Sequence, residues 1–237
     1  MTVFLEVLGG FGGAILDSSG RVTVDAEAGV RALTFLRDAL RATRISPPAV
    51  LAWQEEQVRF AFQNGSAVFM RNWPYAFPLM EDSSQSRIAG RFAVAPMPAG
   101  PGGAPPRHSA VRSSRSTRTP AIPIWPMRSL RISRHRPRCS SVPWSRGSTP
   151  PGPRCYGDST LRRALAIPPE QVRALIERAV PRPVTPVYTE LSEILQIWLH
   201  RALTGQTDPT DALHRAALEM RELLTRVGLG PEAAHVE

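Results

Sequence analysis

The apolar positions in the first hundred residues predict two helices, each with one inward face. The first is expected over residues 26–40, where apolar side chains recur every three or four positions: Val30, Leu33, Leu36 and Leu40. Asp25 directly precedes this stretch and is expected to be its N-cap. The second is expected over residues 51–64, before Gly65, with these side chains inward: Val58, Ala61 and Phe62.

Two further apolar stripes lie near the C-terminal end of the sequence. The first precedes a stop signal at Gly205 and comprises Val187, Leu191, Ile194, Leu195, Trp198 and Ala202. The second follows an N-cap and first-turn pair, Asp208-Pro209, and comprises Leu213, Ala217, Met220 and Leu224 before Gly228. Two such helices in succession predict a helical hairpin packed against a larger body.

Short apolar runs between the helices predict strands. We expect them over residues 21–24, 67–71 and 92–95. Trp73-Pro74-Tyr75 is expected to open a short helix, because proline is tolerated in a first helical turn. A further helix is expected over residues 168–179, followed by an extended link over residues 181–186. Alternating helices and strands favour an α/β fold.

One segment carries the positive charge of the chain. The formal net charge is +9, yet residues 104–157 contain eleven Arg and no Asp or Glu. The remainder has 18 basic and 20 acidic side chains and is therefore slightly acidic. The same segment holds ten Pro and ten Ser and shows little apolar periodicity. We expect folded parts over residues 1–103 and 158–237, with a disordered basic insert over residues 104–157.

The basic segment also supports an alternative function. Its arginines alternate with Trp125, Trp144 and Tyr156, and such a segment could bind RNA or DNA by phosphate neutralisation and base stacking. That binding would fall steeply with salt. Weak binding without sequence preference would equally fit an accidental polycation, so no specific nucleic-acid partner is expected.

Other chemistries find little support in the sequence. The chain contains no Lys, which excludes a Walker-type phosphate loop. Its five His lack the spacing of a zinc site. Glu55 and Glu56 are interpreted as helix-surface carboxylates, because no partner base or nucleophile is evident. We expect no enzyme, no cofactor and no metal.

The sequence contains no apolar run of about 18 residues, so a membrane-spanning helix is not expected. Residues 1–13 have no basic n-region and no small-residue cleavage site, and Glu6 interrupts their apolar stretch. As written, the chain is therefore expected to lack an export signal and to stay in the cytoplasm.

Residues 60–75 carry a resemblance to a known family. They read Phe-Ala-Phe-Gln-Asn-Gly-Ser-Ala-Val-Phe-Met-Arg-Asn-Trp-Pro-Tyr. This order resembles the signature of the extracellular solute-binding proteins, family 1, of ABC sugar importers, especially the trehalose/maltose-binding branch. Similar stretches lie at residues 4–17, with a Gly-Gly-Phe-Gly-Gly core, and at residues 92–100 and 182–197. The resemblance implies a partial periplasmic-binding-protein-like α/β fold, mostly the C-terminal lobe and closing helices.

The resemblance also implies sugar-binding residues. In the family, two lobes close on a sugar, aromatic rings stack on it and polar groups take its hydroxyls. Trp73 and Tyr75 match the stacking motif, and the neighbouring Arg71 and Asn72 are candidate hydrogen-bonding groups. Alternatively, Trp73 is a core residue at a helix start.

Two further positions carry weaker sugar-binding predictions. Gly12 lies in the glycine-rich stretch 9–13, which resembles a cleft loop of the family but could equally make a simple turn. Tyr188 follows the proline-rich link and could face the cleft, or lie in the core or on the surface.

The resemblance implies a sugar, as an oligosaccharide, and ABC permease subunits as partners of a monomer outside the cytoplasmic membrane. It covers residues 1–103 and 156–230. Most of the family's N-terminal lobe has no counterpart in the sequence. We therefore expect a truncated copy with impaired sugar binding.

The gap in the resemblance has a possible genetic explanation. Codons can be chosen for residues 109–118 so that a shifted frame spells Gly-Gly-Gln-Glu-Leu-Ala-Ile-Asn-Ala. Shifted frames of residues 119–127 and 145–156 also give family-like sequence, including a helix start. We hypothesise that residues 107–155 are a frameshifted translation between compensating insertions or deletions.

Overall fold

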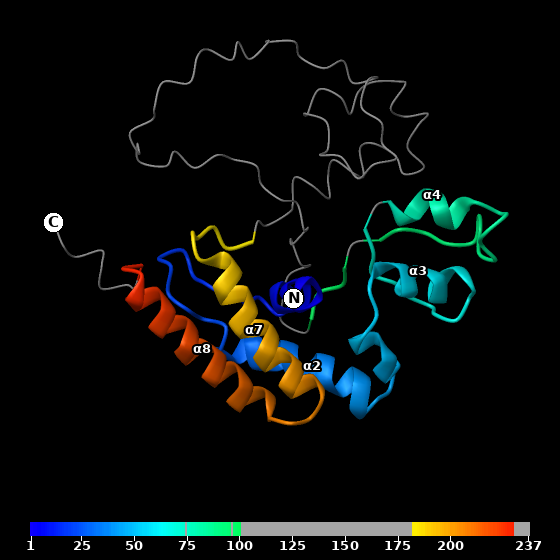
Figure 1. Ribbon diagram of the computed structural model, residues 1–237. Helices are drawn as coiled ribbons and strands as arrows, with labels where there is room; N and C mark the ends of the chain where they lie inside the picture. The colour runs from blue at the N-terminus through cyan, green and yellow to red at the C-terminus, as the bar shows by residue number, and fades with distance from the viewer. Residues whose placement is uncertain (74, 96, 101–181, 230–237) are drawn as a thin grey trace, which may run out of the picture.

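The computed structural model describes residues 1–73, 75–95, 97–100 and 182–229. In these parts every regular element apart from one isolated β-bridge is a helix, and the remaining residues form turns and irregular segments (Figure 1). The helices are α1 (Thr2–Gly10), α2 (Glu27–Arg41), the 3-10 helix η1 (Pro48–Leu51), α3 (Glu55–Gln63), α4 (Ala76–Glu81), α7 (Tyr188–Leu203) and α8 (Pro209–Arg226). None of the described helices is long and apolar enough to cross a membrane.

The main core lies between helices from both ends of the sequence. α7 and α8 pack against each other and against α2, while α1 packs on α2 (Figure 1). The fully buried side chains include Leu33, Leu195, Leu213 and Met220. A Cβ at Gly29 would stand 1.8 Å from the carbonyl oxygen of Val24, so only glycine permits this approach of α2.

The C-terminal hairpin is confirmed. Asp208 caps α8 by accepting a hydrogen bond from the backbone N–H of Thr210 at 2.8 Å, and Pro209 lies in the first turn. Gly205 follows α7 with a φ of 78°, in the left-handed region that glycine adopts at little cost. The predicted inward positions of α8 are all buried: Leu213, Ala217, Met220 and Leu224.

α1 was not predicted, and it changes the interpretation of the glycine-rich stretch. Gly9 and Gly10 lie in the last turn of this helix. The prediction of a loop over residues 9–13 is therefore wrong for these two residues. Packing of Phe4, Leu5 and Leu8 in the core stabilises a helix that its two glycines disfavour. Gly12 follows in a turn with a φ of 79°.

The start of α2 also differs from the prediction. Ala26 is the N-cap, and its side chain makes no capping hydrogen bond. Asp25 instead accepts two hydrogen bonds from Arg221 of α8, both at 2.9 Å. The carboxylate was expected to cap its own helix, but the tertiary fold presents an arginine that bonds it more strongly than a backbone amide does.

α3 begins later than expected and buries polar side chains. Gln54 and Gln57 form a capping box at its start, which places the N-terminus at Glu55 rather than near residue 51. The buried side chains of α3 are Arg59 and Gln63, whereas the predicted inward residues are only partly buried: Val58, Ala61 and Phe62. Gln63 donates a hydrogen bond to the carbonyl oxygen of Leu79 at 2.9 Å, which ties α3 to α4.

The predicted strands are not formed in the described residues. Residues 67–71 and 92–95 belong to no helix or strand, and residues 21–24 contribute only a single antiparallel bridge, between Val22 and Leu16. A strand is completed by hydrogen bonds to a neighbouring strand, and the described chain supplies none for residues 67–71 and 92–95. Val68 and Phe69 are accordingly 83% and 90% exposed.

The short helix after Trp73 exists but begins at Ala76, with Tyr75 as its N-cap. It contacts α3. Three phenylalanine rings pack beside the two helices: Phe62 and Phe77 each contact Phe92, with ring centroids 6.2 and 5.0 Å apart. Within the described residues, the main core includes no side chain from residues 42–100. α3 and α4 therefore form a second helical unit beside it (Figure 1).

The basic insert over residues 104–157, the helix over residues 168–179 and Pro74 lie outside the described residues. The extended link is described from residue 182 and contains no helix or strand up to residue 185.

The hairpin should dominate the stability of the main core. Leu213→Ala removes a side chain with 0% exposure and should lower the free energy of unfolding by about 2–5 kcal/mol. Leu218→Ala, on the same helix but 45% exposed, should change it by about 0.5 kcal/mol or less. Urea denaturation of the full chain, followed by circular dichroism at 222 nm, measures both. Equal losses in the two variants would contradict the described packing of α8.

Candidate functional site

The predicted binding residues Arg71, Trp73 and Tyr75 gather beside the N-terminus of α3. The chain turns at Gly65, whose φ is 77°, after the end of α3. Residues 66–73, which belong to no helix or strand, carry Arg71 and Trp73, and Tyr75 follows them. Two carboxylates on the first turn of α3, Glu55 and Glu56, face this segment through hydrogen bonds. We define the aromatic cluster as these five side chains.

Trp73 is held on its edge and on one face. Its indole Nε1–H donates to Oε1 of Glu55 at 3.1 Å. The guanidinium carbon of Arg71 lies 4.5 Å from the centroid of the indole ring, a cation–π contact. The ring is partly buried, so the alternative of a simple core residue does not describe it.

Arg71 is bound on its other side by a carboxylate of α1. Its Nε donates to both carboxylate oxygens of Glu6, at 3.1 and 2.8 Å, and its Nη2 donates to Oε1 at 2.7 Å. The Glu6 side chain is 7% exposed and the Arg71 side chain 21%. Such forked contacts are stronger and more directional than a single neutral hydrogen bond.

Tyr75 donates its hydroxyl proton to Oε1 of Glu56 at 2.8 Å. Burial, together with this hydrogen bond to a carboxylate, raises the pKa of Tyr75 to about 12. Hydrogen bonds from Arg59 and then from Tyr75 lower the pKa of Glu56. A hydrogen bond from its own backbone N–H, followed by that from Trp73, lowers the pKa of Glu55. Both carboxylates are therefore held ionised at neutral pH.

Asn72 connects the cluster to α3 through its amide. Its Nδ2 donates to the carbonyl oxygen of Glu55 at 3.0 Å, and its Oδ1 accepts from the backbone N–H of Trp73 at 2.8 Å. The side chain was predicted as a hydrogen-bonding group for a ligand. In this structure it fixes the backbone that presents Trp73.

Among the described residues, no hydrogen bond or ring contact joins Gly12 or Tyr188 to the aromatic cluster. Gly12 is exposed in the turn after α1. Tyr188 begins α7, and its hydroxyl is buried without a hydrogen-bond partner among the described residues. Both sugar-binding predictions stay predictions.

Sequence reasoning missed three carboxylates of this region: Glu6, Glu55 and Glu56. Glu55 and Glu56 were interpreted as surface side chains, and nothing in their helical spacing showed that Trp73 and Tyr75 would reach them. For Glu6 a signal existed, because a single carboxylate within an apolar stretch requires a partner when it is buried.

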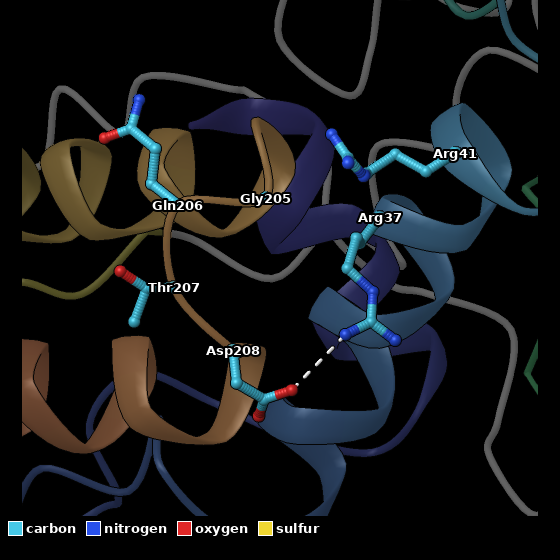
Figure 2. A pocket seen from close by; sticks show the side chains of 6 residues that line it. All are labelled: Arg37, Arg41, Gly205, Gln206, Thr207 and Asp208. Atoms are coloured by element: carbon cyan, nitrogen blue, oxygen red, sulfur yellow. Dashed lines mark hydrogen bonds and ion pairs between the residues drawn. The ribbon is translucent and has the colours of Figure 1, made fainter.

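A concave region lies where the α7–α8 turn meets the end of α2, away from the aromatic cluster. Figure 2 shows its lining: Arg37, Arg41, Gly205, Gln206, Thr207 and Asp208, around a volume of about 420 Å³. Arg37 pairs with Asp208 at 3.4 Å, and Arg41 donates to the carbonyl oxygen of Thr204 at 2.9 Å. Both arginines thus join α2 to the hairpin turn. No predicted binding residue lies there.

Within the described ranges, no three side chains of His, Cys, Asp or Glu come together in a way that could hold a metal ion. The aromatic cluster instead offers ring faces and ionised carboxylates, which suit an uncharged, hydroxyl-rich ligand.

Solved structures identify the fold. MalE3 of T. maritima, determined with maltose bound, matches with a TM-score of 0.75 and 32% identity over 94% of this chain and 57% of that chain. A solute-binding protein of an ABC transporter from Agrobacterium radiobacter K84, determined with ribitol, matches with a TM-score of 0.65 and 18% identity over 93% and 55%. The predicted partial periplasmic-binding-protein fold is confirmed.

Curated sequences give the same class of protein. A probable ABC transporter-binding protein of Deinococcus radiodurans is 42% identical over 102 residues, 43% of this chain and 24% of the relative. A probable amino-acid ABC transporter periplasmic-binding protein of Sinorhizobium fredii, y4oP, is 32% identical over 95 residues, 40% and 22%. The matched segments thus span about a quarter of these relatives. No family model matches the chain. The chain is related to the solute-binding proteins of ABC transporters.

The Tyr75–Glu56 contact can be tested by spectroscopic titration. Among three tyrosines, Tyr75 should ionise near pH 12, seen as tyrosinate absorbance at 295 nm that is missing from Tyr75→Phe. Glu56→Gln removes the negative charge that disfavours tyrosinate, so the pKa of Tyr75 should fall towards its ordinary value of 10. Glu222→Gln, on the exposed face of α8, serves as the control. An unchanged profile in Glu56→Gln would rule out the contact.

Proposed function

We propose that the chain is a sugar-recognising part of the solute-binding protein of an ABC importer. The observation that carries this proposal is the aromatic cluster, in which Trp73 is fixed on one face by Arg71 and at its edge by Glu55. The proposal assigns its other face to stacking on the apolar face of a pyranose ring. The relation to MalE3, which was determined with maltose bound, supports a sugar of the maltose type.

The charges of the region support a sugar over an amino acid. The carboxylate of an amino-acid ligand is commonly bound by an arginine, through paired hydrogen bonds. Arg71 of the cluster and Arg59 beside it are already paired with carboxylates, Arg71 with Glu6 and Arg59 with Glu56. Glu55 and Glu56 are ionised acceptors, which sugar hydroxyls can approach without a change of charge. An amino-acid ligand, which the name of the Sinorhizobium relative suggests for that protein, is the competing outcome.

The proposal places this function outside the cytoplasmic membrane, as in periplasmic binding proteins, with permease subunits of the transporter as partners. Gly12 and Tyr188 are proposed as further contacts of the sugar. The buried hydroxyl of Tyr188 supports this, since a ligand would satisfy a group that has no hydrogen-bond partner among the described residues.

Sugar binding should depend on the ring of Trp73. We expect isothermal calorimetry of the full chain to detect maltose binding, and Trp73→Ala to weaken it at least tenfold through loss of stacking. Trp73→Phe should retain part of the affinity. Ile197→Ala, 53% exposed on α7, is the control and should bind as the unchanged chain does. Binding of an amino acid in place of maltose, or equal affinity in Trp73→Ala, would overturn the proposal.

We also propose that residues 107–155 are translated from a shifted frame. The Gly-Gly turn, strand and helix start spelled by the alternative frame support this, since the family carries these elements at that place. Sequencing the coding DNA across residues 106–158 should reveal an insertion or deletion near each end, with family-like sequence between them. Uninterrupted codon usage typical of the host through the segment would reject the idea.

A further inference from the structure

We propose that Glu6 is a positioning residue that orients Trp73 through Arg71. The inference rests on the proposed sugar-binding function of Trp73 and adds a residue that neither the motif nor the comparisons assign. Three links carry it: Glu6 to Arg71, Arg71 to the indole face, and the indole edge to Glu55.

The first link follows from burial. Glu6 is 5% exposed on α1, between apolar residues that belong to or pack against the main core. A carboxylate in such surroundings is costly unless it is paired and hydrogen-bonded. Arg71 satisfies it with three donated hydrogen bonds of 2.7 to 3.1 Å. The helix therefore holds Arg71 in one orientation.

The second link follows from the shape of the guanidinium group. Its donors are coplanar, so a forked contact with a carboxylate fixes the plane of the group as well as its position. That group lies over the indole of Trp73 with 4.5 Å between guanidinium carbon and ring centroid. An ammonium group could supply the charge but not this planar contact on two sides.

Together with Glu55, these links restrain the indole from two directions. Glu55 holds the ring edge at 3.1 Å, and Arg71 covers one face. Trp73 lies at the end of a segment that belongs to no helix or strand, so side-chain contacts rather than a regular element set the position of its ring. Glu6 thus orders the ring before a ligand arrives, and that lowers the entropic cost of binding.

The experiment uses the full chain labelled with 5-fluorotryptophan and observed by 19F NMR. The chain has five tryptophans, and the resonances of Trp73 and Trp198 are assigned as those missing from Trp73→Phe and Trp198→Phe. In Glu6→Gln the Trp73 resonance should move by more than its line width, while that of Trp198, in the α7–α8 core, should stay. Glu222→Gln should move neither.

A second variant guards against loss of folding. Arg71→Lys keeps the charge but loses the planar fork, and it should move the Trp73 resonance as Glu6→Gln does. The double variant should move it no further than either alone, because both break the same link. An unmoved Trp73 resonance in Arg71→Lys and Glu6→Gln, or a joint movement of the Trp73 and Trp198 resonances, would overturn the positioning role.

Maltose titration separates this inference from the proposed function. Glu6→Gln should weaken maltose binding roughly tenfold, the effect of losing about one charge-assisted hydrogen bond. Absence of maltose binding in the unchanged chain would reject the sugar-binding proposal, while the 19F resonances would still decide whether Glu6 orients Trp73. Unaltered maltose affinity in Glu6→Gln would reject the positioning role alone.

Discussion

The ion pair between Glu6 and Arg71 is the contact on which the candidate site depends. It joins α1, which belongs to the main core, to the segment that follows α3. Within the described residues, these two parts share no apolar core. A polar contact therefore sets how they lie relative to each other. Polar links of this kind are directional, whereas apolar packing tolerates sliding. The orientation of the side chains in the candidate site is therefore set by the geometry of these hydrogen bonds.

The same principle operates inside the α3–α4 unit. α3 buries Arg59 and Gln63, and Gln63 reaches the backbone of α4. Its first turn then projects Glu55 and Glu56 towards Trp73 and Tyr75. The helix α3 therefore presents polar side chains to its surroundings. Its apolar side chain Phe62 packs with Phe77 of α4 against Phe92. The hydrogen bonds reach Trp73 and Tyr75 at the edges of their rings, and Arg71 covers one face of the Trp73 indole.

The sequence-based predictions succeeded for helices that pack a single apolar face against the main core. The stripe of α8 was buried as expected, and so was that of α7 except for Val187 and Ile194, which are partly buried. Gly205 follows the end of α7 and Asp208 caps the start of α8, as predicted. They failed where a side chain had two possible partners. Asp25 was expected to cap α2 but bonds Arg221, a residue 196 positions away. The strands failed because an extended segment becomes a strand only with a neighbour. The motif located Arg71, Trp73 and Tyr75, but not the carboxylates that hold them.

Sequence alone determined the elements whose signals are local: helical periodicity, caps, glycine stops and the Trp-Pro-Tyr motif that carries the family resemblance. These depend on interactions within a few residues of chain, and the order of residues specifies them directly. The tertiary structure alone decided which charges meet. Glu6 and Arg71 are 65 positions apart, and Trp73 lies 18 positions from Glu55. Such pairings depend on how the helices pack, because hydrogen bonds and ion pairs act only over a few ångströms in space.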